Sequence, residues 1–197
     1  MGLRPLRWLL VIGILAFSGT AKADPLNTVK VDGSYAFADP PYGMPPYGGT
    51  LNGHSESFYC VDFSTPISGG DSWYVTITNL TGSNFLSTRL GNQTSYLEMA
   101  WLITQMMGTK DQSQQAAYQF AIWSFTGGPN HQTNAALVAA ALAAVQHGFT
   151  GQGFEILSPT GSMGQEFLIY VPEPSVLLML GIGLIALVIL PRKRLVS

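Results

Sequence analysis

The side chain with the greatest chemical reactivity is that of Cys60, the chain's one cysteine. It lies in residues 57–64, SFYCVDFS, the run with the strongest β-strand pattern. Alternation along a strand places Phe58, Cys60 and Asp62 on one face and the residues between them on the other. A single cysteine excludes a disulfide within the chain. This leaves a buried thiol, an intermolecular bridge or special chemistry at the sulfur.

A second side chain with possible chemistry is that of Gln119, in a predicted helix that begins at Asp111 and runs to Phe125. One turn away along this helix lie Ala116 and Trp123, so the face is mostly apolar and we expect Gln119 to be buried. A buried carboxamide without a hydrogen-bond partner costs about 1–3 kcal/mol. We therefore expect the amide either to be hydrogen-bonded or to have its carbonyl consumed in a covalent bond.

The two motifs around these residues resemble those of the thioester domains of bacterial surface adhesins. They read Tyr59-Cys60-Val61-Asp62 and Tyr118-Gln119-Phe120-Ala121-Ile122-Trp123. The resemblance implies that the Cys60 sulfur attacks the Gln119 carboxamide, ammonia leaves and an internal thioester forms. A lysine amine or another nucleophile on a target surface opens such a bond, which attaches the protein covalently. Asp62 and Trp123 are the supporting residues, and Asp62 could polarise the site or hold a proton.

Two other interpretations of Cys60 remain open. In the first, Cys60 is a small buried hydrophobic residue and Gln119 a hydrogen-bonded core amide, with no covalent chemistry. In the second, Cys60, His54 and Asp62 form a secreted cysteine hydrolase, since these residue types suit nucleophilic catalysis. No local nucleophile motif surrounds Cys60, so the sequence favours a protein that is not an enzyme.

Other chemistries lack a sequence signal. His54, His131 and His147 do not have the spacing of metal ligands, and the acidic residues are scattered singly rather than paired as in glycosidases. Phosphate-binding and dinucleotide-binding glycine motifs are missing from the sequence, so we expect neither a metal nor an organic cofactor. Basic residues do not cluster outside the two terminal segments, which argues against nucleic-acid binding.

The elements that position Cys60 and Gln119 change from β to α along the chain. Strand patterns occupy 26–37, 57–64 and 73–80, and a Pro/Gly-rich loop is expected over 39–53. Helices are expected to begin at a capping box, Ser95-Tyr96-Leu97-Glu98, at Asp111, and near Thr133. Two apolar segments, 154–157 and 167–171, follow. The pattern predicts an α+β fold, a β-sandwich or barrel-like sheet with helices inserted at about 95–147.

The first 23 residues have the three parts of a secretory signal peptide. Arg4 and Arg7 supply the positive region, residues 8–17 the apolar region, and Ala21-Lys22-Ala23 the small-residue cleavage site. The apolar run is too short for a permanent membrane span. We expect cleavage after Ala23, which leaves 24–170 as the exported, β-rich domain.

The other end of the chain carries an uncharged apolar block, SVLLMLGIGLIALVIL, at residues 175–190. Its length and composition predict one transmembrane helix at the carboxyl end of the chain. The basic residues Arg192, Lys193 and Arg194 follow at once and act as a membrane stop. Because cytoplasmic flanks are enriched in Lys and Arg, this end is expected to stay in the cytoplasm and the domain to face the periplasm.

Pro172-Glu173-Pro174, followed by this helix and the basic end, resembles the PEP-CTERM sorting signal over residues 171–197. The alternative is an ordinary single-pass anchor. The resemblance implies a Gram-negative bacterium that makes an extracellular polysaccharide, and an exosortase-type enzyme that removes the tail near Pro172–Pro174. The protein is then expected at the inner membrane in transit, and at the cell surface or in the extracellular matrix after processing. There it would serve adhesion or matrix organisation by binding polysaccharide or another surface ligand.

Overall fold

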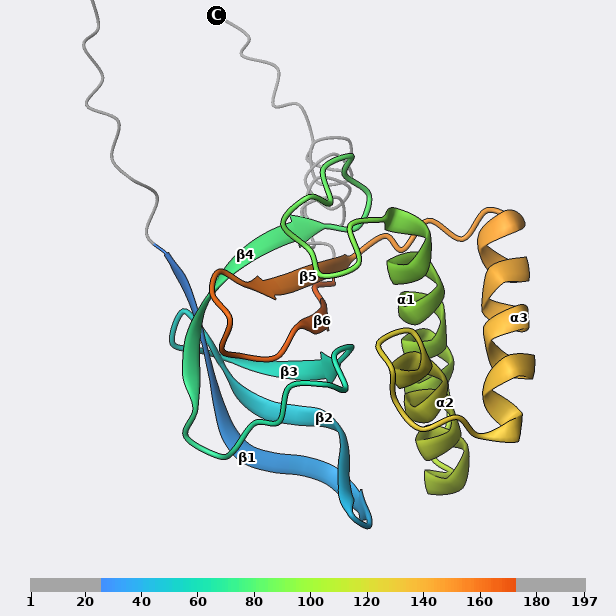
Figure 1. Cartoon of the computed structure of the whole chain (residues 1–197), viewed down its shortest axis with the longest axis horizontal. Coiled ribbons are helices and arrows are strands. Elements are labelled where there is room, and N and C mark those ends of the chain that lie inside the picture. The colour runs from blue at the N-terminus through green and yellow to red at the C-terminus, as the bar shows by residue number, and fades with distance from the viewer. Residues whose placement is uncertain (1–25, 173–197) are drawn as a thin grey trace, which may run out of the picture.

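The domain is built around a closed antiparallel β-barrel (Figure 1). The computed structural model describes residues 26–172. The strands are β1 (Asn27–Asp39), β2 (Tyr42–Leu51), β3 (His54–Cys60), β4 (Ser72–Asn79), β5 (Phe154–Pro159) and β6 (Phe167–Tyr170). Their order around the barrel is β1-β2-β3-β6-β5-β4, and β4 pairs with β1 to close it. Of the two sheet architectures expected, the structure has the barrel rather than the sandwich.

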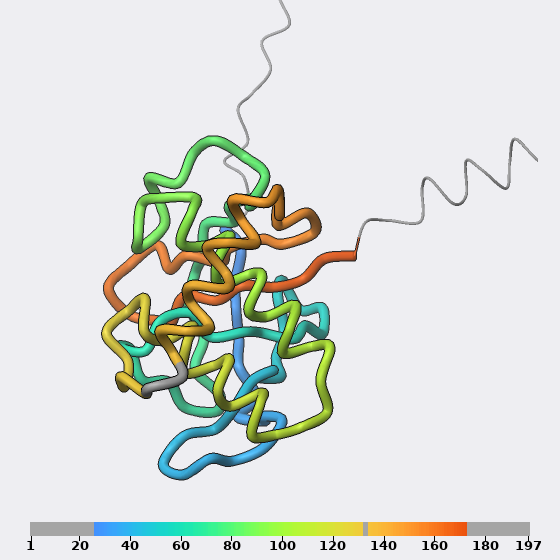
Figure 2. The backbone as a smooth tube through the Cα atoms, turned by 90° about the vertical axis from the view of Figure 1, so that its right-hand side faces the viewer, coloured from blue at the N-terminus to red at the C-terminus, as the bar shows by residue number. Residues whose placement is uncertain are grey.

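The helices are inserted between β4 and β5, as the sequence predicts. They are α1 (Gln93–Gly108), α2 (Gln112–Ser124) and α3 (Gln132–Gln146). All three pack against one another, and α2 also contacts β2. They gather on one side of the barrel, and seen from that side they lie in front of the strands (Figures 1 and 2). The helical unit therefore covers the barrel rather than forming a separate domain.

The start of α1 differs from the predicted capping box. Its N-cap is Asn92, whose side chain accepts a hydrogen bond from the Ser95 backbone N–H over 2.9 Å. Asparagine is as good an N-cap as serine, so the helix gains a further turn before Ser95. The predicted cap of α2 is confirmed, since the Asp111 carboxylate accepts from the backbone N–H of Ser113 and Gln114.

The prediction of a loop over the Pro/Gly-rich residues 39–53 is wrong, because most of this segment forms β2. Between Tyr47 and Met44 this strand has one residue more than the opposite stretch of β1, so Pro45 and Pro46 lie at a register shift. Their missing N–H groups are tolerated there because a bulge does not require every ladder hydrogen bond. Pairing of β2 with β3 begins only at Tyr47, beyond the prolines.

The strand that contains Cys60 is displaced relative to its prediction. It begins at His54 and ends at Cys60, instead of running on to Ser64. Phe58 and Cys60 lie on one face and Tyr59 on the other, as predicted. Phe63, expected opposite Cys60, packs instead against the same cluster as Cys60. Strand alternation fails there because the Phe63 N–H donates to the Thr126 hydroxyl rather than to a neighbouring strand.

Two apolar clusters make up the core. One fills the barrel and includes Phe58, Cys60 and Trp123; the other lies between the helices and the barrel wall and includes Tyr96 and Ile122. Helix α2 contributes to both clusters, since its Ala116 and Trp123 join the first and its Ala121 and Ile122 the second. Gln119 is on the same helix between these residues and therefore lies where the two clusters meet.

The predicted signal peptide, residues 1–23, and the predicted transmembrane helix, residues 175–190, fall outside the described residues. Within 26–172 we find no helix with the length and apolar character needed to cross a bilayer.

The close approach of β1 and β2 predicts a requirement for glycine at position 49. A Cβ added to Gly49 would lie 2.2 Å from the Lys30 carbonyl oxygen, which belongs to the paired strand and cannot move freely. Gly49→Ala should lower the free energy of unfolding by about 1–3 kcal/mol, the usual cost of overpacking. Chemical denaturation of the full-length protein in detergent, followed by circular dichroism, measures this. Gly161→Ala is the matched control, because nothing lies within 4 Å of its added Cβ; equal losses in both variants would contradict the prediction.

Candidate functional site

The structure brings Cys60 and Gln119 together from elements 59 residues apart in the sequence. Cys60 ends β3, and Gln119 lies in the middle of α2. The Gln119 Nε2 donates a hydrogen bond of 2.8 Å to the backbone carbonyl of Cys60, and both residues are fully buried. The predicted burial of Gln119 is thus confirmed, and its carboxamide lies against the residue that carries the thiol.

The sulfur of Cys60 has two polar contacts. The indole Nε1 of Trp123 donates to Sγ over 3.2 Å, and Sγ donates to the Asp62 backbone carbonyl over 3.3 Å. Burial raises the pKa of the Cys60 thiol to about 12, although the Trp123 hydrogen bond acts in the opposite direction. At neutral pH the sulfur is therefore a protonated thiol in a water-poor site, with a donor already positioned to stabilise negative charge on it.

The carbonyl oxygen of Gln119 is buried and has no hydrogen-bond partner in residues 26–172. The orientation of the amide is set by its nitrogen: exchanging N and O would place Oε1 against the Cys60 carbonyl oxygen, two acceptors 2.8 Å apart. An unsatisfied buried acceptor costs about 1–3 kcal/mol. The fold thus holds the Gln119 carboxamide against the backbone of Cys60 with its carbonyl oxygen unsatisfied.

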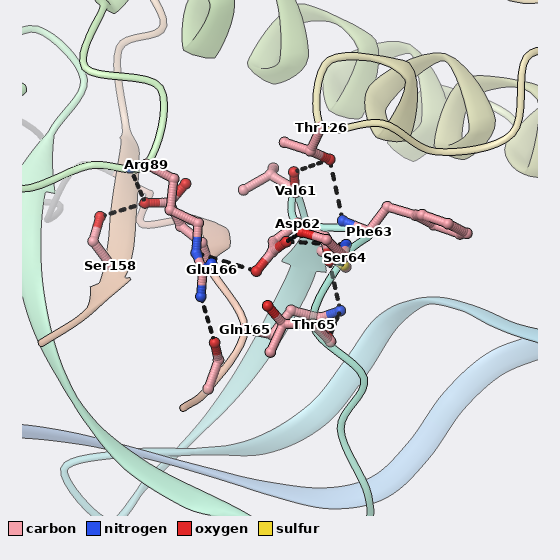
Figure 3. Close-up of polar contacts among 12 residues, drawn as sticks. Val61, Asp62, Phe63, Ser64, Thr65, Arg89, Thr126, Ser158, Gln165 and Glu166 are labelled. Carbon is pink, nitrogen blue, oxygen red and sulfur yellow. Dashed lines mark hydrogen bonds and ion pairs between the residues drawn. The ribbon is translucent and has the colours of Figure 1, made fainter. Parts of the chain in front are cut away.

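The carboxylate of Asp62 has partners other than the sulfur. Its Oδ1 accepts from the backbone N–H and the hydroxyl of Ser64, and its Oδ2 lies 3.1 Å from Arg89 Nε as an ion pair (Figure 3). Oδ2 accepts no hydrogen bond, so this contact is electrostatic. Asp62 touches the predicted site through its backbone carbonyl, and its predicted role in polarisation or proton transfer stays a prediction.

A second buried carboxylate, that of Glu166, has no counterpart in the sequence analysis. It accepts from the Tyr96 hydroxyl, the Ser158 hydroxyl (2.6 Å) and the Arg89 backbone N–H (3.0 Å), and Figure 3 shows the last two contacts. The Arg89 guanidinium also donates to the Gly164 carbonyl. A single acid before an apolar strand gives no sequence signal of such a network, because its partners come from three separate segments.

The segment after β3 is held in place by side chains from both sides. Thr126 donates to the Val61 carbonyl and accepts from the Phe63 N–H, while Gln165 Nε2 donates to the carbonyls of Asp62 (2.7 Å) and Thr65 (2.9 Å). Several of these residues are labelled in Figure 3. These contacts fix the chain that carries the Asp62 carbonyl and therefore the contact of that carbonyl with the thiol.

The three histidines considered for a hydrolase or a metal site do not assemble around Cys60. His54 and Cys60 are the first and last residues of β3, and six strand steps separate them by about 20 Å. The His131 ring packs on Phe120 at 4.3 Å, and His147 is the C-cap of α3. Among residues 26–172 no group of three or more His, Cys, Asp or Glu side chains is arranged to hold a metal ion.

The predicted processing segment begins where the barrel ends. The Val171 N–H donates to the Gly153 carbonyl over 2.7 Å, and Pro172 is exposed. The other predicted processing and membrane-stop residues lie outside the described residues: Ala23, Glu173, Pro174, Arg192, Lys193 and Arg194.

Comparison with known proteins identifies this same segment. Residues 171–193 match the family model of the PEP-CTERM protein-sorting motif. The search of curated proteins and the search of solved structures found no match. The motif supports an exported protein that crosses the membrane, has an exosortase as its processing partner, and ends at the cell surface or outside the cell. The match includes neither Cys60 nor Gln119, so the thioester stays a prediction.

Glu166 predicts a pH dependence of stability. Burial raises the pKa of its carboxyl above the ordinary 4.5, and hydrogen bonds from Ser158 and Tyr96 oppose the rise. Because the folded state keeps this proton to a higher pH than the unfolded chain, Glu166 destabilises the domain progressively as the pH rises from 4.5 to the raised pKa of the folded state, and the effect is constant above it. Its contribution has a limiting slope of about 1.4 kcal/mol per pH unit.

Glu166→Gln removes that titration. The unfolding free energy of the wild type minus that of the variant should therefore fall as the pH increases through this window, which urea titrations at several pH values measure. Asp39→Asn, at the end of β1 away from the network, is the control for the loss of a carboxylate. A constant difference between wild type and Glu166→Gln would show that Glu166 does not titrate there.

Proposed function

Because the chain is a PEP-CTERM protein, we propose that its processed domain is a non-enzymatic adhesion or matrix protein. It acts at the cell surface or in the extracellular polysaccharide and attaches covalently through an internal thioester between Cys60 and Gln119. The sorting motif supplies the destination, and the chemistry rests on the two buried side chains.

One observation carries the covalent part of the proposal: the Gln119 carboxamide donates to the backbone carbonyl of Cys60 and leaves its own carbonyl oxygen unsatisfied. A core amide chosen only for packing would be expected to satisfy both its oxygen and its nitrogen. Here only the nitrogen is satisfied, and its acceptor is the backbone of the cysteine itself.

Thioester formation would proceed by addition of sulfur to the amide carbon. The S–C bond forms, the C–N bond breaks, and the thiol proton leaves with the nitrogen as ammonia. Burial keeps water away from the product, which protects it from hydrolysis. The Trp123 Nε1–H, already 3.2 Å from the sulfur, would stabilise charge on it both when the bond forms and when an external amine breaks it.

The alternative of an inert core cysteine draws its support from the same burial, since Cys60 packs with Phe58 and Trp123 in the barrel cluster. It leaves the unsatisfied Gln119 oxygen without a role. The hydrolase alternative has less support. His54 lies at the end of β3 opposite to Cys60, and the Asp62 carboxylate contacts Arg89 and Ser64 rather than a histidine. Unchanged behaviour in Cys60→Ser would favour the inert core, and ester or amide turnover lost in both Cys60→Ala and His54→Ala would favour the hydrolase.

The mass of the intact protein tests the thioester. We expect the full-length protein, purified in detergent without reducing agent or amines, to weigh less than its expected chain mass by one ammonia. Methylamine should then add its own mass and release a thiol that titrates after denaturation. Cys60→Ala and Gln119→Ala should each show the full mass of their own sequence and no reaction with methylamine.

The control is Gln115→Ala, a glutamine one turn earlier on α2 whose Nε2 donates to the Thr109 carbonyl, outside the site. It should keep the mass deficit of the wild type. A wild-type protein with its full expected mass and one titratable thiol would contradict the thioester and leave the sorted matrix protein with an inert core.

A further inference from the structure

A cavity of 390 Å³ adjoins the Cys60 site. It is open to solvent and is bounded by parts of β1 and β2, by the segment after β3, and by Trp123 of α2. Trp123 lines this cavity and donates its Nε1–H to the Cys60 sulfur, so one indole ring separates the cavity from the thiol. The volume is in the range of small-molecule sites.

Aromatic rings dominate the wall. Tyr42, Phe63 and Trp123 pack mutually, with centroid distances of 5.4 Å for Tyr42–Trp123, 5.6 Å for Tyr42–Phe63 and 5.3 Å for Phe63–Trp123. The Tyr47 hydroxyl donates to the Gly43 carbonyl, which holds a fourth ring in place. Tyr35, at the rim, is 51% exposed. The rings are therefore set before any ligand arrives, which lowers the entropic cost of binding.

The wall also holds one polar group that lacks a partner. Gln165 lines the cavity and is only 7% exposed, and its Oε1 accepts no hydrogen bond from residues 26–172. Its Nε2 is committed to the carbonyls of Asp62 and Thr65, so the amide cannot be reversed without placing its oxygen against theirs. This oxygen is sealed from solvent, so Gln165 fixes the wall of the cavity and is not reached by a ligand.

None of the residues lining the cavity carries a charge. A charged ligand would lose its hydration there without a countercharge, which is costly. At the rim, the Ser34 hydroxyl donates to the Asp32 carboxylate over 2.6 Å, and that carboxylate would repel an anion. The ligand class that fits is neutral, has a flat apolar face for the rings, and has hydroxyl groups that can bond to the polar, uncharged side chains of the lining.

We propose that this cavity binds a neutral sugar unit, with the C–H face of the pyranose on the aromatic rings and its hydroxyls toward the Thr65 and Ser68 side chains, which also line the cavity. The site is non-covalent and goes beyond the proposed thioester, because it gives the domain affinity for a glycan whether or not the thioester forms. It would also hold glycan-bearing material next to the Cys60 site.

Calorimetric titration of the full-length protein in detergent tests the proposal. The probes are short neutral oligosaccharides of glucose, galactose and mannose, together with an oligouronate and an oligomer of glucosamine. We expect at least one neutral oligosaccharide to bind and both charged ones to bind more weakly. Tyr35→Ala should weaken that binding about tenfold, the scale of one lost aromatic contact, and Phe63→Leu should weaken it further.

Tyr74→Ala is the matched control, since Tyr74 is also an exposed strand tyrosine, at 54%, but does not line the cavity. It should bind as the wild type does. Preferential binding of the uronate or the glucosamine oligomer, no binding of any neutral probe, or equal effects of Tyr35→Ala and Tyr74→Ala would overturn the proposal. Weighing the same samples by mass spectrometry reports the thioester separately, so failure of one proposal is distinguishable from failure of the other.

Discussion

The hydrogen bond from Gln119 to the Cys60 carbonyl joins the two halves of the domain. On one side is a barrel whose strands pair around a closed circuit, and on the other a unit of helices whose apolar residues share one cluster with residues of the barrel strands. A polar bond in a dry place is specific as well as stabilising, because misplacing it would leave two buried groups unsatisfied. It fixes the position of α2 over the end of β3, and with it the arrangement of thiol, indole and carboxamide.

Buried charge is held close to this site without entering it. Asp62 and Glu166 are both almost fully buried, and Arg89 forms an ion pair with the first and gives its backbone N–H to the second. Burying carboxylates is costly unless such partners are provided. These contacts tie together the segments before α1, after β3 and before β6. The residues that line the aromatic cavity carry no charge, which suits a neutral ligand.

The sequence determined the features that depend on neighbours along the chain. The sorting motif, the change from strands to helices, the start of α2 at Asp111 and the burial of Gln119 all follow from local composition or from a period of two or 3.6 residues. Such signals survive in a single sequence because the residues that create them are adjacent or one turn apart.

Tertiary contacts decided the rest. Only the pairing of β1 with β2 and the bulge at Pro45 and Pro46 made a strand of a segment rich in proline and glycine. Side-chain hydrogen bonds of Thr126 and Gln165 ended the strand alternation after Cys60. The network of Glu166, the unsatisfied oxygens of Gln119 and Gln165, and the uncharged aromatic cavity depend on residues far apart in the chain. Composition and spacing along the chain do not predict which distant groups the closed barrel brings within hydrogen-bonding distance.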